Sequence, residues 1–446
     1  MADNIPPSIA ELQQRYDAGL SPVRVIEDCL ERIASSNDRI NAMIFVGGEE
    51  ALEQAYALEA ELRSGRSRGP LHGIPVAVKD VIDVKGWPTT SGSRLFGDHV
   101  AADDAICIQN LRAAGGVIVG KTNLHQLTAG GHDNPWFGKV VNPLNPTHGT
   151  GGTSSGSAAA VAAGFCLAAL GTDTGGSNGS TAAATGLVGF KPTNGCVDTR
   201  GVRPTAPSLD VIGPIASSIE DARLVHFAAL GGATPGAETI PLAGLRIGLC
   251  SDLYASRVDP VVAGAHERLL RALTAAGARS TPLAFPLAGA VKDAGLTILQ
   301  YEFAACYADR IEAAPDAVGS AARDFAAGGR AISSAAYERA LMLRRQARVE
   351  FLELMSSVDL VLAPVAPGLA PRLSDEMSAV GDTWTPYGPA GGSFRRWANF
   401  FGLPALAMPL PTPGDLPASI QISTLPDTDA LLFSLAEAVF RAEEAR

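Results

Sequence analysis

Basic residues are fewer than acidic ones in this sequence, and they form no cluster along the chain. The 446 residues include 35 Lys and Arg against 46 Asp and Glu, which gives a formal net charge of −11 at pH 7. No run of Lys or Arg stands out from this acidic background. Neutralising a phosphate backbone requires a basic face. The composition therefore excludes nucleic-acid binding as a function of this chain by itself.

Paired cysteines and metal-ligand spacings are also missing. The six cysteines form no C-x-x-C pair, and the seven histidines form no H-E-x-x-H motif, since His266-Glu267 lacks the second histidine. Zinc ribbons, dense disulfide frameworks and zincin sites depend on such spacings. We expect reduced thiols, no metal and no cofactor.

No segment is apolar for long enough to span a bilayer. The longest weakly polar stretch, Ala158–Gly171, has 14 residues, whereas a spanning helix needs roughly 18–20. Residues 1–7 also lack the basic start and apolar core of a secretory signal. These absences predict a cytoplasmic protein without membrane contact, in which Ala158–Gly171 forms a buried helix.

Short apolar runs alternate with helical stretches along most of the chain. Residues 8–62 and 255–356 favour helices, and a last helix is expected from Asp429. The runs typical of buried strands are Ile74–Val78, Val117–Val119, Leu187–Phe190, Leu245–Leu249, Val358–Val365 and Ala405–Pro409. Strands separated by helices predict an α/β core.

Two motif matches fail in their context. Gly115–Thr122 fits the phosphate-loop pattern G-x-x-x-x-G-K-[ST], yet the apolar triplet Val117–Val119 stands where that loop is polar. Gly152–Gly156 fits the nucleophile elbow G-x-S-x-G, which needs a strand directly before it, and the prolines in residues 142–150 oppose one. A serine hydrolase with His226 or His266 as its base stays open as the runner-up enzyme class.

Two Gly/Ser-rich segments adjoin stretches apolar enough to be buried. Gly151–Ser157 leads into Ala158–Gly164, and Gly171–Ser177 leads toward Ala182–Ala184. A flexible connector has no reason to border core segments twice. Buried Gly-rich turns with hydroxyls instead bring backbone N–H groups together into a nest that holds an oxyanion.

At these segments the chain resembles the amidase signature family. The likeness continues in family order through Gly73–Asp80, Gly120–Asn123, Gly189–Gly195, Ser208–Pro214, Pro364–Pro367 and Ala398–Pro404. It implies a single α/β domain over residues 1–446, with a large mixed sheet of about ten or more strands flanked by helices. The signature core is expected at about 66–235, and a helical subregion at about 255–356.

The resemblance also implies a mechanism for cleaving a small carboxamide. Ser177 takes the place of the nucleophile that forms the acyl-enzyme, and Lys79 takes the place of the base. A lysine accepts the serine proton only when burial brings its pKa down from about 10.4. The implied oxyanion hole consists of the backbone N–H groups of Thr174, Gly175, Gly176 and Ser177.

The sequence departs from the family at two places. Thr153 replaces the serine whose hydroxyl bridges base and nucleophile, and its extra methyl restricts χ1. Ser154 is the alternative relay. Gly179 and Thr181 replace the family's arginine and proline, so any pairing of that cation with Asp173 is made differently here.

Substrate choice is expected from loops outside the triad. The residues nominated for it are Gly130, Gly131, Trp136, Tyr387, Arg395 and Arg396. The two arginines either clamp a substrate carboxylate or pair with an acidic neighbour.

The expected partners are a small amide and, as an open option, a second copy of the chain, with no nucleic acid. Two alternatives to a small-amide hydrolase stay open. One is the ammonia-producing subunit of a tRNA-dependent amidotransferase, and the other is a family member without enzymatic function.

Overall fold

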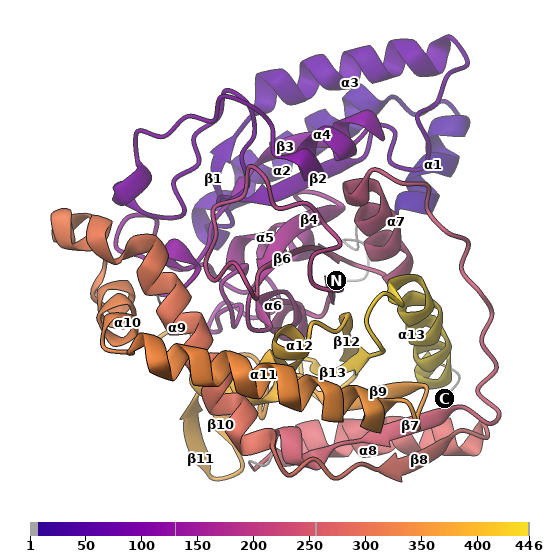
Figure 1. Cartoon of the computed structure of the whole chain (residues 1–446). Coiled ribbons are helices and arrows are strands. Elements are labelled where there is room, and N and C mark those ends of the chain that lie inside the picture. The colour runs from indigo at the N-terminus through magenta and orange to yellow at the C-terminus, as the bar shows by residue number, and fades with distance from the viewer. Residues whose placement is uncertain (1–7, 130, 255–256, 445–446) are drawn as a thin grey trace.

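The structure is a computed structural model that describes residues 8–129, 131–254 and 257–444. One sheet of eleven strands runs through these residues in the order β1-β3-β2-β4-β6-β5-β12-β13-β9-β7-β8. The helices cover both faces and both ends of this sheet (Figure 1). No helix in the described ranges is long and apolar enough to cross a membrane.

The first half of the sheet holds a parallel group of three strands. Strand β2 (Pro75–Lys79) lies between β3 (Val117–Thr122) and β4 (Ala168–Asp173) and is parallel to both. Parallel strands end at the same sheet edge, so Lys79 and Asp173, the last residues of β2 and β4, lie at one edge of the sheet. The flanking strands β1 (Met43–Val46), β5 (Val188–Lys191) and β6 (Val211–Ala216) pair antiparallel with their neighbours.

The second half of the sheet continues from β5 to the far edge. Its strands are β12 (Ala405–Leu410), β13 (Ala418–Ser423), β9 (Leu360–Pro364), β7 (Arg246–Leu249) and β8 (Arg279–Pro282). All six expected strand runs match strands of this sheet, and the expected mixed α/β architecture is confirmed.

Two short helices carry the Gly/Ser segments and are almost entirely buried. They are α5 (Ser155–Ala162) and α6 (Ser177–Thr185), built largely of Ala, Ser and Gly. Small side chains let the backbones approach one another closely. A Cβ on Gly156 would lie 2.4 Å from the carbonyl oxygen of Ala42 and 2.5 Å from the Asn123 nitrogen, so only glycine fits there.

The buried helix expected over Ala158–Gly171 is only half as long as predicted. Helix α5 ends at Ala162, and Gly164 adopts a left-handed conformation with φ 71° that turns the chain. From Ala168 the same apolar stretch continues as β4. A short apolar run fits a buried helix and a buried strand equally well. Here Gly164 marks the point where the helix ends and the chain turns toward the strand.

The remaining helices surround this core. At the β1 end lie α1 (Ile9–Asp17), α2 (Pro22–Ile40) and α3 (Gly48–Arg63), drawn in indigo and violet in Figure 1. The others are α4 (Ile106–Ala113), α7 (Ile219–Leu230), α8 (Pro260–Ala275), α9 (Ala288–Ala313), α10 (Ser320–Arg330), α11 (Ser334–Met355), α12 (Tyr387–Phe401) and α13 (Asp429–Glu444). Short 3₁₀ turns cover Arg94–Phe96, Gln126–Thr128, Ser251–Tyr254 and Pro315–Ala317.

Two segments expected to be helical contain strands. Strand β8 interrupts the 255–356 segment, of which residues 255 and 256 lie outside the described residues, and β1 interrupts residues 8–62. The sequence of β8 is Arg-Ser-Thr-Pro, and all four of its residues are exposed. Such an edge strand has no apolar alternation by which a sequence could reveal it. A hairpin of β10 (Met377–Val380) and β11 (Thr383–Pro386) was likewise not expected.

Candidate active site

The ammonium of Lys79 is buried among hydroxyl groups at the end of β2. Its side chain is 0% exposed, and its Nζ lies 3.0 Å from Thr153 Oγ1, 3.2 Å from Ser154 Oγ and 2.9 Å from Thr172 Oγ1. Burial lowers the pKa of Lys79 to about 7, although the charges of Asp173 and Asp210 oppose this shift. Near neutral pH the uncharged amine is therefore well populated and can accept a proton.

Ser177 begins α6 directly after a sharp turn. Gly176 adopts a left-handed conformation with φ 98°, which disfavours any residue with a Cβ. A Cβ at this position would also lie 2.1 Å from Cγ of Arg395. The Ser177 hydroxyl donates a hydrogen bond to the carbonyl oxygen of Thr172, the same residue whose hydroxyl contacts Lys79.

A buried carboxylate holds this turn in place. Asp173 Oδ1 accepts hydrogen bonds from the N–H of Gly176 at 2.6 Å and from Nδ2 of Asn399 at 2.9 Å. Its Oδ2 accepts from the N–H of Asn178 at 2.8 Å. Asp173 is fully buried, and the three donors offset the cost of burying its charge. Asn399 had no predicted role, although it lies inside one of the segments that match the family.

The hydrogen bond from Gly176 to Asp173 removes one donor from the predicted oxyanion hole. Because the Gly176 N–H already has an acceptor, the prediction is reduced to the N–H groups of Thr174, Gly175 and Ser177. The Thr174 hydroxyl donates to Asp210 Oδ1 at 2.6 Å, and burial raises the pKa of Asp210 to about 6. This contact is a second hydrogen bond that holds the loop before Ser177.

A cavity of about 600 Å³ opens over Ser177. Its wall includes Thr153 and Ser177 but not Ser154, which is buried and donates to Asn178 Oδ1 at 3.0 Å. Both hydroxyls contact Lys79, and of the two residues only Thr153 also lines the cavity. Thr153 therefore stays the predicted bridging hydroxyl.

The structure separates the residues nominated for substrate binding into two groups. Gly131, Arg395 and Arg396 line the cavity. Trp136 and Tyr387 do not: the Trp136 indole donates to the carbonyl oxygen of Ala317 at 3.2 Å, and the buried Tyr387 ring packs beneath Gly151. Gly130 lies outside the described residues. Both aromatic side chains instead contact residues that are distant from them in the sequence.

A group of possible metal ligands not expected from the sequence lies at the start of α13. Cys196, His226 and Asp429 each place one ligand atom within 4.8 Å of the others. The Asp429 carboxylate already accepts a hydrogen bond from the Thr193 N–H at 2.8 Å. Burial raises the pKa of Cys196 to about 12, which disfavours the thiolate that binds metals. These features favour a structural role for the three residues, which attach the start of α13 to the rest of the protein, over a role as metal ligands.

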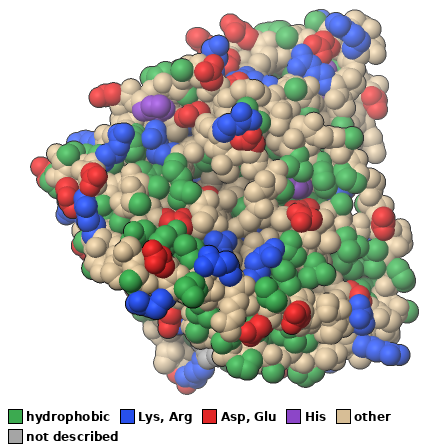
Figure 2. Space-filling view, viewed as in Figure 1, with side chains coloured by type: hydrophobic (Ala, Val, Ile, Leu, Met, Phe, Trp, Pro, Cys, Tyr) green, Lys and Arg blue, Asp and Glu red, His purple; other side chains and the backbone are tan. Residues whose placement is uncertain are grey.

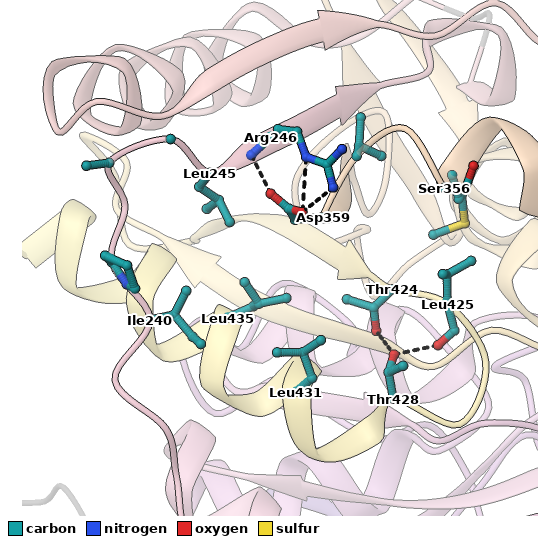
Figure 3. Close-up of a pocket in the computed structure, with 15 residues that line it drawn as sticks. Ile240, Leu245, Arg246, Ser356, Asp359, Thr424, Leu425, Thr428, Leu431 and Leu435 are labelled. Atoms are coloured by element: carbon teal, nitrogen blue, oxygen red, sulfur yellow. Dashed lines mark hydrogen bonds and ion pairs between the residues drawn. The ribbon is translucent and has the colours of Figure 1, made fainter.

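A second hollow of about 500 Å³ lies between β7, the end of α11 and α13 (Figure 3). Its described wall is mainly aliphatic, and its cation Arg246 is paired with Asp359 at 2.7 Å. Neither His226 nor His266 lines this hollow or the cavity at Ser177. The two histidines predicted as the base of a serine-histidine hydrolase therefore lie at neither place.

Comparison with known proteins identifies the class of enzyme to which this fold and the cavity at Ser177 belong. A family model described as Amidase matches residues 24–433. The chain belongs to the amidase signature family, as its motifs predicted. It is an enzyme that acts on carbon–nitrogen bonds of amides other than peptide bonds.

Individual relatives fall into two groups. A glutamyl-tRNA(Gln) amidotransferase subunit from Methanothermobacter thermautotrophicus is 32% identical over 93% of this chain and 95% of its own. A crystal structure of an amidase superposes with a TM-score of 0.91 at 32% identity, covering 98% of this chain and 99% of that one. The corresponding amidotransferase subunit from Thermotoga maritima gives a TM-score of 0.77 at 27% identity, covering 98% and 95%.

These relatives correct the expected partners. The sequence predicts a small amide as partner, no nucleic acid bound by the chain by itself and, as an open option, a second copy of the chain. Two of these relatives are subunits of a glutamyl-tRNA(Gln) amidotransferase, and this finding contradicts the predicted partners. On the face shown in Figure 2, basic and acidic side chains are interspersed.

Amide hydrolysis is expected to depend on pH through Lys79. Because the unprotonated amine is the reactive form and its pKa is about 7, kcat/KM should rise about tenfold per pH unit below this value and level off above it. A pH series from 5 to about 9 with an amide substrate checks this. Lys79→Met should abolish the rise together with the activity. A flat profile in the unmodified enzyme would contradict the role of Lys79.

Substitutions at Thr153 separate its hydroxyl from its shape. Thr153→Ser keeps a hydroxyl near Lys79 and should retain or increase kcat, because the serine side chain is less restricted. Thr153→Val keeps the shape but removes the proton path, with an expected loss of about 10²–10⁴ in kcat. Ser154→Ala serves as the matched control at the second hydroxyl. Full activity of the valine variant would show that Thr153 is not the relay.

Proposed function

We propose that the chain is the amide-hydrolysing, ammonia-producing subunit of a tRNA-dependent amidotransferase. The observation that carries the chemistry is the buried amine of Lys79, which lies within 3.2 Å of three hydroxyls. One of these belongs to Thr153, which lines the same cavity as Ser177. The assignment to an assembly is supported by the similarity to an amidotransferase subunit over nearly the full length of both chains. The six free cysteines fit a cytoplasmic setting.

In the proposed reaction, Lys79 takes a proton from the Thr153 hydroxyl while Thr153 takes one from Ser177. The Ser177 oxygen attacks the amide carbon, and the N–H groups of Thr174, Gly175 and Ser177 stabilise the negative charge on the carbonyl oxygen. Return of the proton to the amide nitrogen releases ammonia and leaves an ester on Ser177. Water then enters by the same proton path and frees the carboxylic acid.

The negative charge of Asp173 supports this reaction without touching the substrate. Its carboxylate orients the Gly176 and Asn178 N–H groups and so sets the shape of the turn before Ser177. A preorganised turn costs no rearrangement when charge develops on the substrate oxygen. Asp173 is therefore a positioning residue in this proposal.

Amide hydrolysis by the chain alone is a second candidate function. It is favoured by the TM-score, which is 0.91 with the amidase and 0.77 with the amidotransferase subunit. The two candidates share Lys79, Thr153 and Ser177 and differ in where the ammonia goes.

Labelling with a fluorophosphonate tests the nucleophile. The pure chain should gain a single adduct by intact mass, and peptide sequencing should place it on Ser177, because an activated serine reacts with this reagent. Lys79→Ala should prevent labelling, whereas Ser155→Ala, at a hydroxyl that does not contact Lys79, should not. An adduct on another serine, or no adduct, would contradict the proposed nucleophile.

Reconstitution tests the assembly. Expressed together with the other subunits of an amidotransferase, the chain should form a complex of fixed stoichiometry by native mass spectrometry and support amidation of glutamyl-tRNA(Gln). The Ser177→Ala complex should assemble equally well and lose the amide-dependent reaction. Full turnover of an amide panel by the isolated chain, with no complex formed, would favour the second candidate instead.

A further inference from the structure

A guanidinium outside the cavity binds two segments that adjoin the loop before Ser177. Arg344 lies on α11, and the described wall of the cavity does not include it. Its Nη1 donates to Ser208 Oγ at 3.1 Å, and its Nη2 donates to the carbonyl oxygen of Ser208 at 3.0 Å. Its Nε donates to the carbonyl oxygen of Phe400 at 2.7 Å, and its Nη2 lies 3.4 Å from that of Asn399. One planar fork therefore joins the segment before β6 to the last turn of α12.

The segment that contains Ser208 also contains the carboxylate that holds Thr174. Asp210 follows Ser208 by two residues, and its Oδ2 accepts hydrogen bonds from the N–H groups of Thr205 at 2.7 Å and Ala206 at 3.0 Å. Its Oδ1 accepts the hydroxyl of Thr174 at 2.6 Å. The backbone N–H of Thr174 belongs to the predicted oxyanion hole. The position of Ser208 is thus linked to this N–H through one carboxylate.

The last turn of α12 holds the same loop at Asp173. Asn399 Nδ2 donates to Asp173 Oδ1 at 2.9 Å and to the carbonyl oxygen of Asp173 at 3.0 Å. The same nitrogen lies 3.4 Å from the carbonyl oxygen of Leu209. Asp173 in turn accepts the N–H of Gly176, one residue before the nucleophile. A displacement of either segment would therefore move the loop that carries the predicted oxyanion donors.

The surroundings of Arg344 hold its guanidinium in one orientation. Glu302 on α9 accepts the Ser208 N–H at 2.8 Å and the Tyr337 hydroxyl at 2.8 Å. Burial lowers the pKa of Arg344, and the charge of Glu302 opposes this shift. The last carbonyl groups of a helix have no partner within it and form the negative end of its dipole, which favours a cation there.

We propose that Arg344 is a positioning residue for the reaction at Ser177. The proposal rests on the proposed function, since it concerns the same oxyanion hole. By joining Ser208 to α12, the guanidinium fixes the two anchors of the loop, Asp210 and Asn399, relative to each other. A loop held in this way needs no rearrangement when negative charge develops on the substrate oxygen. A displacement of about 1 Å can cost about 10²-fold in rate, even when it starts far from the reacting atoms.

Substitution of Arg344 tests this against a neighbour on the same helix. In an assay of ammonia release from a panel of amides, Arg344→Gln should lower kcat about tenfold or more and leave KM within about twofold, because the loop stabilises the transition state. Arg348→Gln is the matched control. Arg348 Nε donates to the carbonyl oxygen of Phe401 at 2.8 Å, at the same helix end, but forms no hydrogen bond to Ser208 or Asn399. This variant should keep kcat within about twofold of the unmodified enzyme.

Two further measurements separate positioning from general stability. The rate of fluorophosphonate labelling at Ser177 should fall in Arg344→Gln, because the phosphonyl oxygen occupies the same oxyanion hole. Peptides that cover residues 173–178 should exchange their amide hydrogens faster in this variant and not in Arg348→Gln. Arg344→Lys should recover part of the rate, because lysine keeps the charge and donors but not the planar fork, and it replaces Arg344→Gln if circular dichroism shows that the latter is unfolded.

A double variant tests the path from Arg344 to the loop. Thr174→Val removes the hydroxyl bonded to Asp210 and leaves the backbone N–H of residue 174 in place. If Arg344 acts through this contact, the loss of kcat in the double variant should be smaller than the product of the two single losses. Losses that multiply fully would contradict the path through Asp210.

The outcomes separate this proposal from the proposed function. An unchanged kcat and labelling rate in Arg344→Gln, or equal losses in Arg344→Gln and Arg348→Gln, would overturn the positioning role. A loss specific to Arg344, with faster exchange in residues 173–178, supports it. If the unmodified chain neither labels at Ser177 nor hydrolyses any amide, the proposed function fails. Hydrogen exchange then still decides whether Arg344 holds the loop, and equal exchange in Arg344→Gln and the unmodified chain would overturn that role too.

Discussion

The site depends on an amine that is buried without a carboxylate to neutralise it. Lys121 on the adjacent strand provides the contrast, because it is equally buried but lies 3.1 Å from Asp80 Oδ1. Lys79 has three hydroxyls at that distance and, among the described residues, no carboxylate within ion-pair range. A carboxylate holds a lysine in its charged form, whereas hydroxyls satisfy its hydrogen bonds in either form. Burial lowers the pKa of both lysines, and at Lys121 the ion pair with Asp80 opposes this shift, whereas Lys79 forms no ion pair with a described residue.

The order of the strands creates this environment. Strand β2 has a parallel neighbour on each side, so its last residue, Lys79, is buried at the sheet edge where β4 also ends. The turn after β4 then passes Asp173 and reaches Ser177, while the segment before α5 supplies Thr153. Short Ala, Gly and Ser side chains in α5 and α6 allow both helix starts to approach the strand ends. The spacing of hydroxyls around Lys79 is therefore a consequence of backbone packing.

The resemblance to the amidase signature family predicted which residues form this part of the structure, and long-range contacts account for most of what the sequence missed. Lys79, Thr153 and Ser177 were assigned through that resemblance, and the fold places Thr153 beside Lys79 and on the same cavity wall as Ser177. The direction of the Trp136 side chain depends on Ala317, far along the chain, and the Asp173 turn depends on Asn399. No local pattern reports such pairs. Strand β8 is polar and exposed, so it lacked the alternation that reveals a strand.

Helix α6 lacks the arginine that the family carries at position 179, and a buried arginine of α12 lies close to the turn that precedes this helix. Burial lowers the pKa of Arg395, and the charges of Tyr387 and Asp173 oppose this shift. Its stem crosses the face of Gly176, where any Cβ would collide with it. The carboxylate of Asp173 remains bonded to three donors of its own, so Arg395 acts on it through charge rather than a direct bond. The next residue along the helix, Arg396, does not share that role and faces the cavity.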